Sequence, residues 1–133
     1  MITGVNHIGI AVKDLNNSIS VFSKILGTDK YHTETVAEQK VNVASFNIGG
    51  VLIELTAPTS EDSPIAKFIE KKGEGIHHIG FESDNVKDEL VRLKNDGLQL
   101  IDNEPRFGAH EMLIAFLHPK STNSVLTEIC QHK

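Results

Sequence analysis

One pattern of residues occurs twice along the chain, and this repeat constrains the fold more than any other feature of the sequence. Residues 5–12 and 76–83 both read as short strands. Each has a histidine at its third position followed by Ile-Gly, so that His7 corresponds to His78. In both copies, apolar residues follow the histidine by 8, 12 and 15 positions. These spacings place the apolar residues on one face of a helix. The repeat therefore predicts two modules with the same internal order.

The predicted helix in each copy has recognisable ends. Asp14 or a neighbouring residue in the first copy, and Asp84 or Asn85 in the second, can cap the helix start through a side-chain oxygen. Gly27 and Gly97 follow the corresponding histidines by 20 and 19 residues, at the position where helices commonly end on a glycine.

Strand patterns come after each helix. Segments 41–48 and 51–57 flank Gly49-Gly50, a dipeptide typical of tight hairpins, and segments 112–118 and 125–131 flank a polar turn. Each copy therefore contains a predicted hairpin.

A further strand is expected directly after each helix, near 31–36 in the first copy and near 98–101 in the second. Each copy then reads β-α-β-β-β. Residues 63–72 carry Pro64 at a first-turn position and predict a short helix that joins the copies.

The predicted organisation is a single α+β domain over residues 1–133. Two βαβββ modules, at about 1–60 and 74–133, are expected to be related by a pseudo-twofold axis and to form a curved mixed sheet. The length suits one compact domain, or two small halves that share a core.

Strand alternation singles out four chemically active side chains. Successive side chains of a strand point to opposite faces. His7 and His78 therefore lie opposite the apolar residues that follow them, and Glu54 and Glu128 lie opposite the apolar residues of their own strands. Each copy thus contributes one histidine and one carboxylate. The pseudo-twofold axis would bring the four together on the concave side of the sheet.

Two imidazoles and two carboxylates form a mixed nitrogen and oxygen donor set. Such a set suits one divalent Zn, Ni, Co, Fe or Mn ion and leaves positions for water or substrate. Any one of the four residues taken alone is more simply explained as an ordinary solvent-facing strand residue, so the repeat carries the prediction. The small residues Gly9, Ala11 and Gly80 are expected to leave room for a ligand.

Composition narrows the class of protein. The chain is 39% hydrophobic and 23% charged, as in ordinary globular proteins, and has no apolar run that could span a membrane. Its net charge of −5, with scattered lysines, argues against nucleic-acid binding. Its N-terminus does not read as a signal peptide. The single cysteine, Cys130, agrees with a reducing compartment, so we expect a cytoplasmic protein.

Three segments resemble a known family. Residues 61–68, 73–79 and 116–121 are similar to signatures of methylmalonyl-CoA epimerases. Residues 7–12 and 53–55 are similar to segments found more widely in the vicinal oxygen chelate, or glyoxalase-fold, superfamily. The resemblance covers nearly the whole chain and implies the glyoxalase/bleomycin-resistance fold.

The resemblance also implies a metal site. The family's metal ligands correspond to His7, His78 and Glu128, and Glu54 occupies the fourth place, where some epimerases have glutamine. The neighbouring His77 would point to the opposite face, and we expect it to be a packing residue or a residue that supports the ligands.

The chain departs from the family in its loops. Lys40, Glu111-Met112 and Asn123-Ser124 stand where the family commonly has Gly, Gly-Lys and Gly-Gly. Val43 stands where some epimerases carry a glutamate proposed as a base. These departures affect loops that shape substrate binding.

The implied activity is epimerisation of an acyl-CoA thioester, through removal and return of the proton next to a carbonyl. A metal would stabilise the enolate, and a carboxylate would move the proton. We favour Glu128 over Glu54 as this acid/base group, with Glu38, Gln39 or ordered water as the fallback. Gln39 is also a candidate substrate-binding residue. Lys120 is another, towards a phosphate of coenzyme A, although a solvated turn lysine is the more common case.

Other functions stay open. A lactoylglutathione lyase of the glyoxalase I type, acting on a glutathione hemithioacetal, would use the same four ligands, and Glu54 suits that enzyme. A non-catalytic binding or resistance protein on this fold usually lacks a complete ligand set. A dioxygenase generally uses three ligands and a longer chain. The resemblance also implies a homodimer. A second reason to expect one is that paired modules leave sheet edges to cover.

Overall fold

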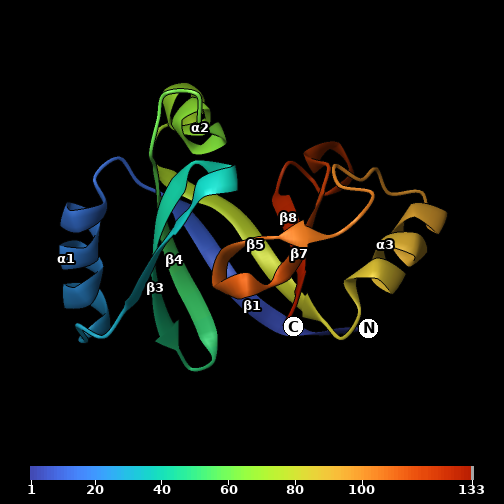
Figure 1. The fold of residues 1–133 in the computed structure, drawn as a ribbon, viewed down its shortest axis with the longest axis horizontal. Coiled ribbons are helices and arrows are strands. Elements are labelled where there is room, and N and C mark those ends of the chain that lie inside the picture. The colour runs from blue at the N-terminus through green and yellow to red at the C-terminus, as the bar shows by residue number, and fades with distance from the viewer. Residues whose placement is uncertain (133) are drawn as a thin grey trace. The chain divides into compact units, whose positions relative to one another are not determined.

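The computed structural model describes residues 1–132 and contains the β-α-β-β-β order twice (Figure 1). The first copy consists of β1 (Ile2–Ala11), α1 (Leu15–Leu26), β2 (His32–Val36), β3 (Val41–Ile48) and β4 (Val51–Pro58). The second copy consists of β5 (Gly75–Ser83), α3 (Val86–Asn95), β6 (Arg106–Phe107), β7 (Leu113–Leu117) and β8 (Leu126–Gln131). Between the copies lies α2 (Pro64–Lys72), and three short 3-10 turns complete the chain: η1 (Ala37–Gln39), η2 (Ala109–Glu111) and η3 (Pro119–Ser121). The element order predicted from the repeat is confirmed.

The helix ends form as their sequences predict. The Asp14 side chain accepts a hydrogen bond from the Asn17 backbone N–H, and Gly27 ends α1 with a positive φ of 68°. In the second copy the capping residue is Asn85, whose side chain accepts from the Asp88 backbone N–H at 3.1 Å. Within residues 1–132, no helix is long and apolar enough to cross a membrane.

The chain divides into two compact units. Unit 1 contains residues 1–7 and the chain from His78 onward, and unit 2 contains Ile8–His77. The strands β1 and β5 each contribute residues to both units.

Unit 2 is built on the antiparallel strands β2, β3 and β4, with the C-terminal part of β1 beside β4. Helices α1 and α2 pack on β4 (Figure 1). Ile19 of α1 is buried against Phe46 and Leu55, and Phe22 packs on the same cluster. The apolar spacing predicted for the first helix therefore faces the core of this unit. Gly49 and Gly50 both have positive φ, as expected in a tight hairpin between β3 and β4.

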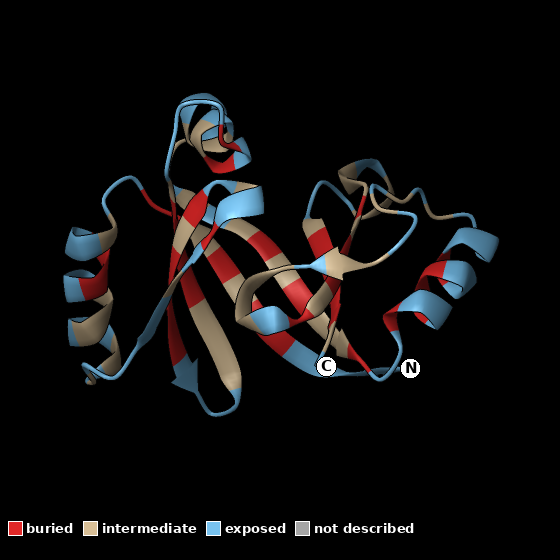
Figure 2. Cartoon of the chain, viewed as in Figure 1, coloured by how far each residue is buried: buried red, intermediate tan, exposed pale blue. Residues whose placement is uncertain are grey.

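Unit 1 is built on a mixed sheet. Strand β5 pairs in parallel with β8, β8 pairs antiparallel with β7, and β7 pairs antiparallel with β6. The N-terminal part of β1 lies on the other side of β5. Val86, Leu90 and Leu93 of α3 are buried against Leu117 and Ile129, while the outward side of the helix is exposed (Figure 2).

The strand predicted near 98–101 forms only in part. That segment pairs with β7 at one isolated bridge, between Leu100 and Leu117, with backbone hydrogen bonds from the Ile101 N–H to the Phe116 carbonyl and from the His118 N–H to the Gln99 carbonyl. The longer pairing after α3 is the two-residue β6. The pairing of this segment with β7 stops at Asp102, because a carboxylate oxygen of Asp102 accepts the Phe116 backbone N–H at 2.8 Å. A continuing strand would have used that N–H in its own ladder.

Candidate metal centre

Three of the predicted metal ligands come together in unit 1. His7 lies on β1, His78 on β5 and Glu128 on β8, and all three side chains are buried. The parallel register of β5 and β8 places Gly80 opposite Glu128. Because side chains two residues apart share a face, His78 and Glu128 project from the same side of these neighbouring strands.

The donor atoms converge. Nε2 of His7 lies 3.0 Å from Nε2 of His78 and 3.1 Å from Oε2 of Glu128. Nε2 of His78 lies 3.8 Å from Oε1 of Glu128. Ligand atoms about 2.1 Å from a shared ion, at angles between about 90° and 110°, are about 3.0–3.4 Å apart. The observed spacings are close to this range, so the three side chains fit a divalent ion.

The imidazole of His7 occupies the space above Gly80. A β-carbon added at Gly80 would lie 2.1 Å from Cε1 of His7. We predicted that the small residue at position 80 leaves room for a ligand, but in the structure this room is filled by the His7 ring itself. A glycine is required here by close approach, whereas its backbone conformation is one that any residue can adopt.

Glu54 belongs to unit 2. It lies on β4 opposite Ser45 of β3 and is buried. A buried carboxylate is costly unless it is paired or binds a cation, so its placement agrees with a functional role. Its role as the fourth ligand stays a prediction.

Cys130 also lies at the site, although the sequence did not predict it there. It follows Glu128 by two residues on β8, and its sulfur lies with ligand atoms of Glu128 and His7 within 4.8 Å of one another. Burial raises the pKa of the Cys130 thiol, and Sγ donates a weak hydrogen bond to the Phe81 carbonyl at 3.4 Å. Cys130 therefore lines the site as a thiol. The two-residue spacing from Glu128 was the signal that could have identified it.

An aromatic side chain lies beside His78. Phe116 of β7 lies opposite Glu128 of β8, and its ring centroid is 5.9 Å from that of His78. The Arg106 guanidinium lies 5.6 Å from the Phe116 ring and is paired with Asp102 at 3.3 Å. One side of the donor set is therefore apolar.

The remaining residues singled out in the sequence lie elsewhere. Gln39 is half-buried in η1 of unit 2, and Lys120 is exposed in η3 of unit 1. Their assignment to substrate stays a prediction. The His77 ring packs edge-on against Phe68, with centroids 4.8 Å apart, and burial lowers the pKa of His77 to about 4. His77 is thus a neutral packing residue, as expected.

Known proteins resemble this chain over nearly its whole length. YqjC of Bacillus subtilis, an uncharacterized protein, is 46% identical over 97% of this chain and 92% of its own length. The human mitochondrial methylmalonyl-CoA epimerase is 38% identical over 96% of this chain and 73% of its own length. A solved methylmalonyl-CoA epimerase in complex with methylmalonyl-CoA and NH4+ superposes with a TM-score of 0.94 at 36% identity, covering 98% of this chain and 95% of that one.

The family match agrees with these relatives. Residues 6–116 match the glyoxalase/bleomycin resistance protein/dioxygenase superfamily. The matched region includes His7, Glu54 and His78. The chain therefore belongs to the glyoxalase/bleomycin resistance protein/dioxygenase superfamily, within which methylmalonyl-CoA epimerases are its relatives.

Proposed function

We propose that this protein is a metal-dependent epimerase of an acyl-CoA thioester of the methylmalonyl-CoA type. The observation that carries the proposal is the buried convergence of His7, His78 and Glu128, with donor atoms 3.0–3.8 Å apart. Its relatives supply the substrate class, because the epimerases among them align with nearly the whole chain.

The donor set supports one divalent ion, Zn, Ni, Co, Fe or Mn, held by these three residues with Glu54 as the fourth ligand. When bound, such an ion would supply Lewis-acid stabilisation to negative charge that develops on an acyl oxygen.

In the proposed reaction, side chains of the protein transfer the proton. Glu128 removes the proton next to the carbonyl, and Glu54 is the second carboxylate available to return one. Phe116 keeps water from one side of the donor set, which strengthens electrostatic interactions there. Return of the proton to the opposite face of the carbon completes an epimerisation.

One observation favours a second candidate function. Glu54 is a carboxylate at the fourth position, which suits a lactoylglutathione lyase acting on a glutathione hemithioacetal. Both reactions move a proton on carbon next to a carbonyl, so the same site could serve either. The substrate distinguishes them.

The test is proton exchange in heavy water. Metal-loaded protein is incubated with methylmalonyl-CoA, and deuterium uptake at C2 is followed by mass spectrometry. The hemithioacetal of methylglyoxal and glutathione is assayed beside it. We expect exchange with the first substrate, none with the second, and loss of exchange after treatment with a chelator. Conversion of the hemithioacetal alone would replace the epimerase by the lyase. Activity on neither substrate with metal bound would contradict both.

We also infer a homodimer. Strands β2 and β6 are the outermost strands of their units, and edge strands are commonly covered by a partner. Light scattering at micromolar concentration should give the mass of two chains, and a monomer there would contradict the inference.

A further inference from the structure

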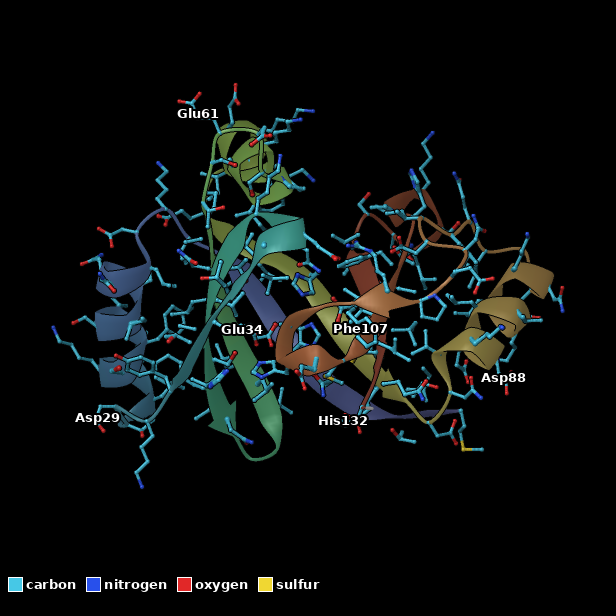
Figure 3. All side chains as sticks on the ribbon, in the orientation of Figure 1. Asp29, Glu34, Glu61, Asp88, Phe107 and His132 are labelled. Carbon is cyan, nitrogen blue, oxygen red and sulfur yellow. The ribbon has the colours of Figure 1, made fainter. Side chains whose placement is uncertain are left out.

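Two hydrogen bonds connect Glu82 to His7 through Asn6 in unit 1. Asn6 is buried, and its Oδ1 lies 2.8 Å from Nδ1 of His7. Nδ2 of Asn6 donates to Oε1 of Glu82 at 2.8 Å. The same Glu82 oxygen lies 3.0 Å from Nε2 of His132, which is largely exposed near the C-terminal end (Figure 3). His7 therefore has a partner for each ring nitrogen: Asn6 at Nδ1, and the metal-ligand cluster at Nε2.

The direction of each of these hydrogen bonds follows from Glu82. An ionised carboxylate only accepts, so the Asn6 atom facing Glu82 must be the amide nitrogen. The amide oxygen of Asn6 then faces His7. Because that oxygen cannot donate, the proton of a neutral His7 must be on Nδ1. Nε2 is left as the bare nitrogen, and it is the atom that faces His78 and Glu128.

We propose that Asn6 and Glu82 are positioning residues that hold His7 in its Nδ1–H tautomer and so make Nε2 the metal-binding atom. This inference rests on the metal site of the proposed function. Hydrogen-bonded partners of a ligating histidine orient the ring and raise its basicity, and their loss typically weakens metal affinity about 10- to 100-fold. The carboxylate that sets the tautomer is 76 residues from Asn6 along the chain.

Four proteins test the role of the hydrogen bonds separately from packing. Asn6→Leu keeps the volume of the side chain but cannot accept the Nδ1 proton. The double variant Asn6→Asp/Glu82→Gln reverses the bond between these two positions, because the new amide would donate to the new carboxylate. That carboxylate still offers His7 an acceptor. His132→Ala removes the outer partner of Glu82 and leaves Asn6 untouched. The wild-type protein completes the set.

The first measurement is the tautomer itself. In metal-free protein labelled with 15N in its histidines, at a pH at which the His7 ring is neutral, long-range proton–nitrogen correlation spectra report which ring nitrogen of His7 carries the proton. Wild type, the double variant and His132→Ala should show the Nδ1–H form, and Asn6→Leu should show loss of its predominance. A wild-type His7 in the Nε2–H form would overturn the proposal, whether or not the protein binds metal.

The second measurement is affinity for Co2+, determined by competition with a chromogenic chelator. Asn6→Leu should bind about 10- to 100-fold more weakly than wild type. The double variant should return to within a few-fold, and His132→Ala should be unchanged. Equal affinity in Asn6→Leu and wild type, with native circular dichroism, would overturn the positioning role. Absence of Co2+ binding in wild type would instead defeat the proposed function, and the tautomer measurement distinguishes the two failures.

Discussion

The His7 ring fills the space that a side chain on Gly80 would need: a β-carbon on residue 80 would lie 2.1 Å from Cε1 of the ring and 2.6 Å from its Nε2. Residue 80 comes from β5 and residue 7 from β1. The glycine therefore determines where the histidine can stand, and the ring position determines where its Nε2 points.

Gly80→Ala should weaken metal binding by at least about tenfold, because the His7 ring must move away from the other donors. Overpacking should also lower the free energy of unfolding by about 1–3 kcal/mol. Gly4→Ala is the matched control, since a β-carbon there meets no atom within 4 Å and the residue lies on the same β1 strand as His7. Metal titration and urea denaturation measure both effects. Equal metal affinity in the two variants would contradict the steric argument.

Removing a ligand imidazole should remove most of the bound metal. Wild-type protein is expected to contain about one divalent ion per chain, and His78→Ala to lose most of it, because the buried donor atom disappears. The control is the adjacent His77→Ala, since His77 packs against Phe68. Elemental analysis of purified protein gives the stoichiometry. Full metal content in a His7→Ala/His78→Ala double variant would refute the site.

The parts of the fold that depend on residues close together in the sequence were predictable. The helix faces and caps and the Gly49-Gly50 hairpin depend on residues close in sequence, so spacing alone identified them. The strand after α3 depends on Asp102 accepting a backbone N–H fourteen residues away. No local pattern reports a hydrogen bond of that kind, and the strand predicted near 98–101 is therefore reduced to a single bridge.

The candidate site was also predictable only in part. Alternation along β1, β5 and β8 identified His7, His78 and Glu128, because period two fixes which face a side chain joins. The bond from Asn6 to Glu82 crosses between strands, and the fit of the His7 ring over Gly80 depends on the separation of β1 and β5. Both are properties of strand pairing, and one strand read by itself does not contain them.

Loop residues that depart from the family adopt the backbone that glycine favours. Glu111, Asn123 and Ser124 have φ values of 56°, 56° and 67°, in the left-handed region. Side chains other than asparagine and aspartate are strained there. Ser124→Gly should therefore raise the free energy of unfolding by about 0.5–1 kcal/mol, and Asn123→Gly should change it less. Urea denaturation compares the two. Destabilisation by Ser124→Gly would show that the serine makes a compensating contact.

The ion pair between Lys40 and Asp62 should be visible in a pH titration. The Lys40 ammonium, followed by the Ser60 hydroxyl, lowers the pKa of Asp62 from 3.8 to about 2. A lowered carboxyl pKa contributes stability above pH 3.8, and this contribution is lost as pH falls towards 2. Lys40→Asn removes the cation with a residue that tolerates the positive φ at this position. The pKa of Asp62, measured by carbon NMR, should move back towards 3.8. An unchanged value would mean that the pair does not form in solution.

Replacing Glu128 by glutamine separates its two proposed roles, metal ligand and acid/base group. Glutamine keeps an oxygen donor and nearly the same shape, but it loses the negative charge and the basicity. If Glu128 moves the proton, metal should stay largely bound while deuterium uptake into methylmalonyl-CoA falls by on the order of 10²–10⁴. Glu54→Gln is the comparison, because it makes the same change at the other carboxylate, and its loss of exchange should be smaller. Parallel loss of metal and exchange in Glu128→Gln would make this residue a ligand only. Proton removal would then fall to Glu54, and the larger loss of exchange with metal retained should appear in Glu54→Gln.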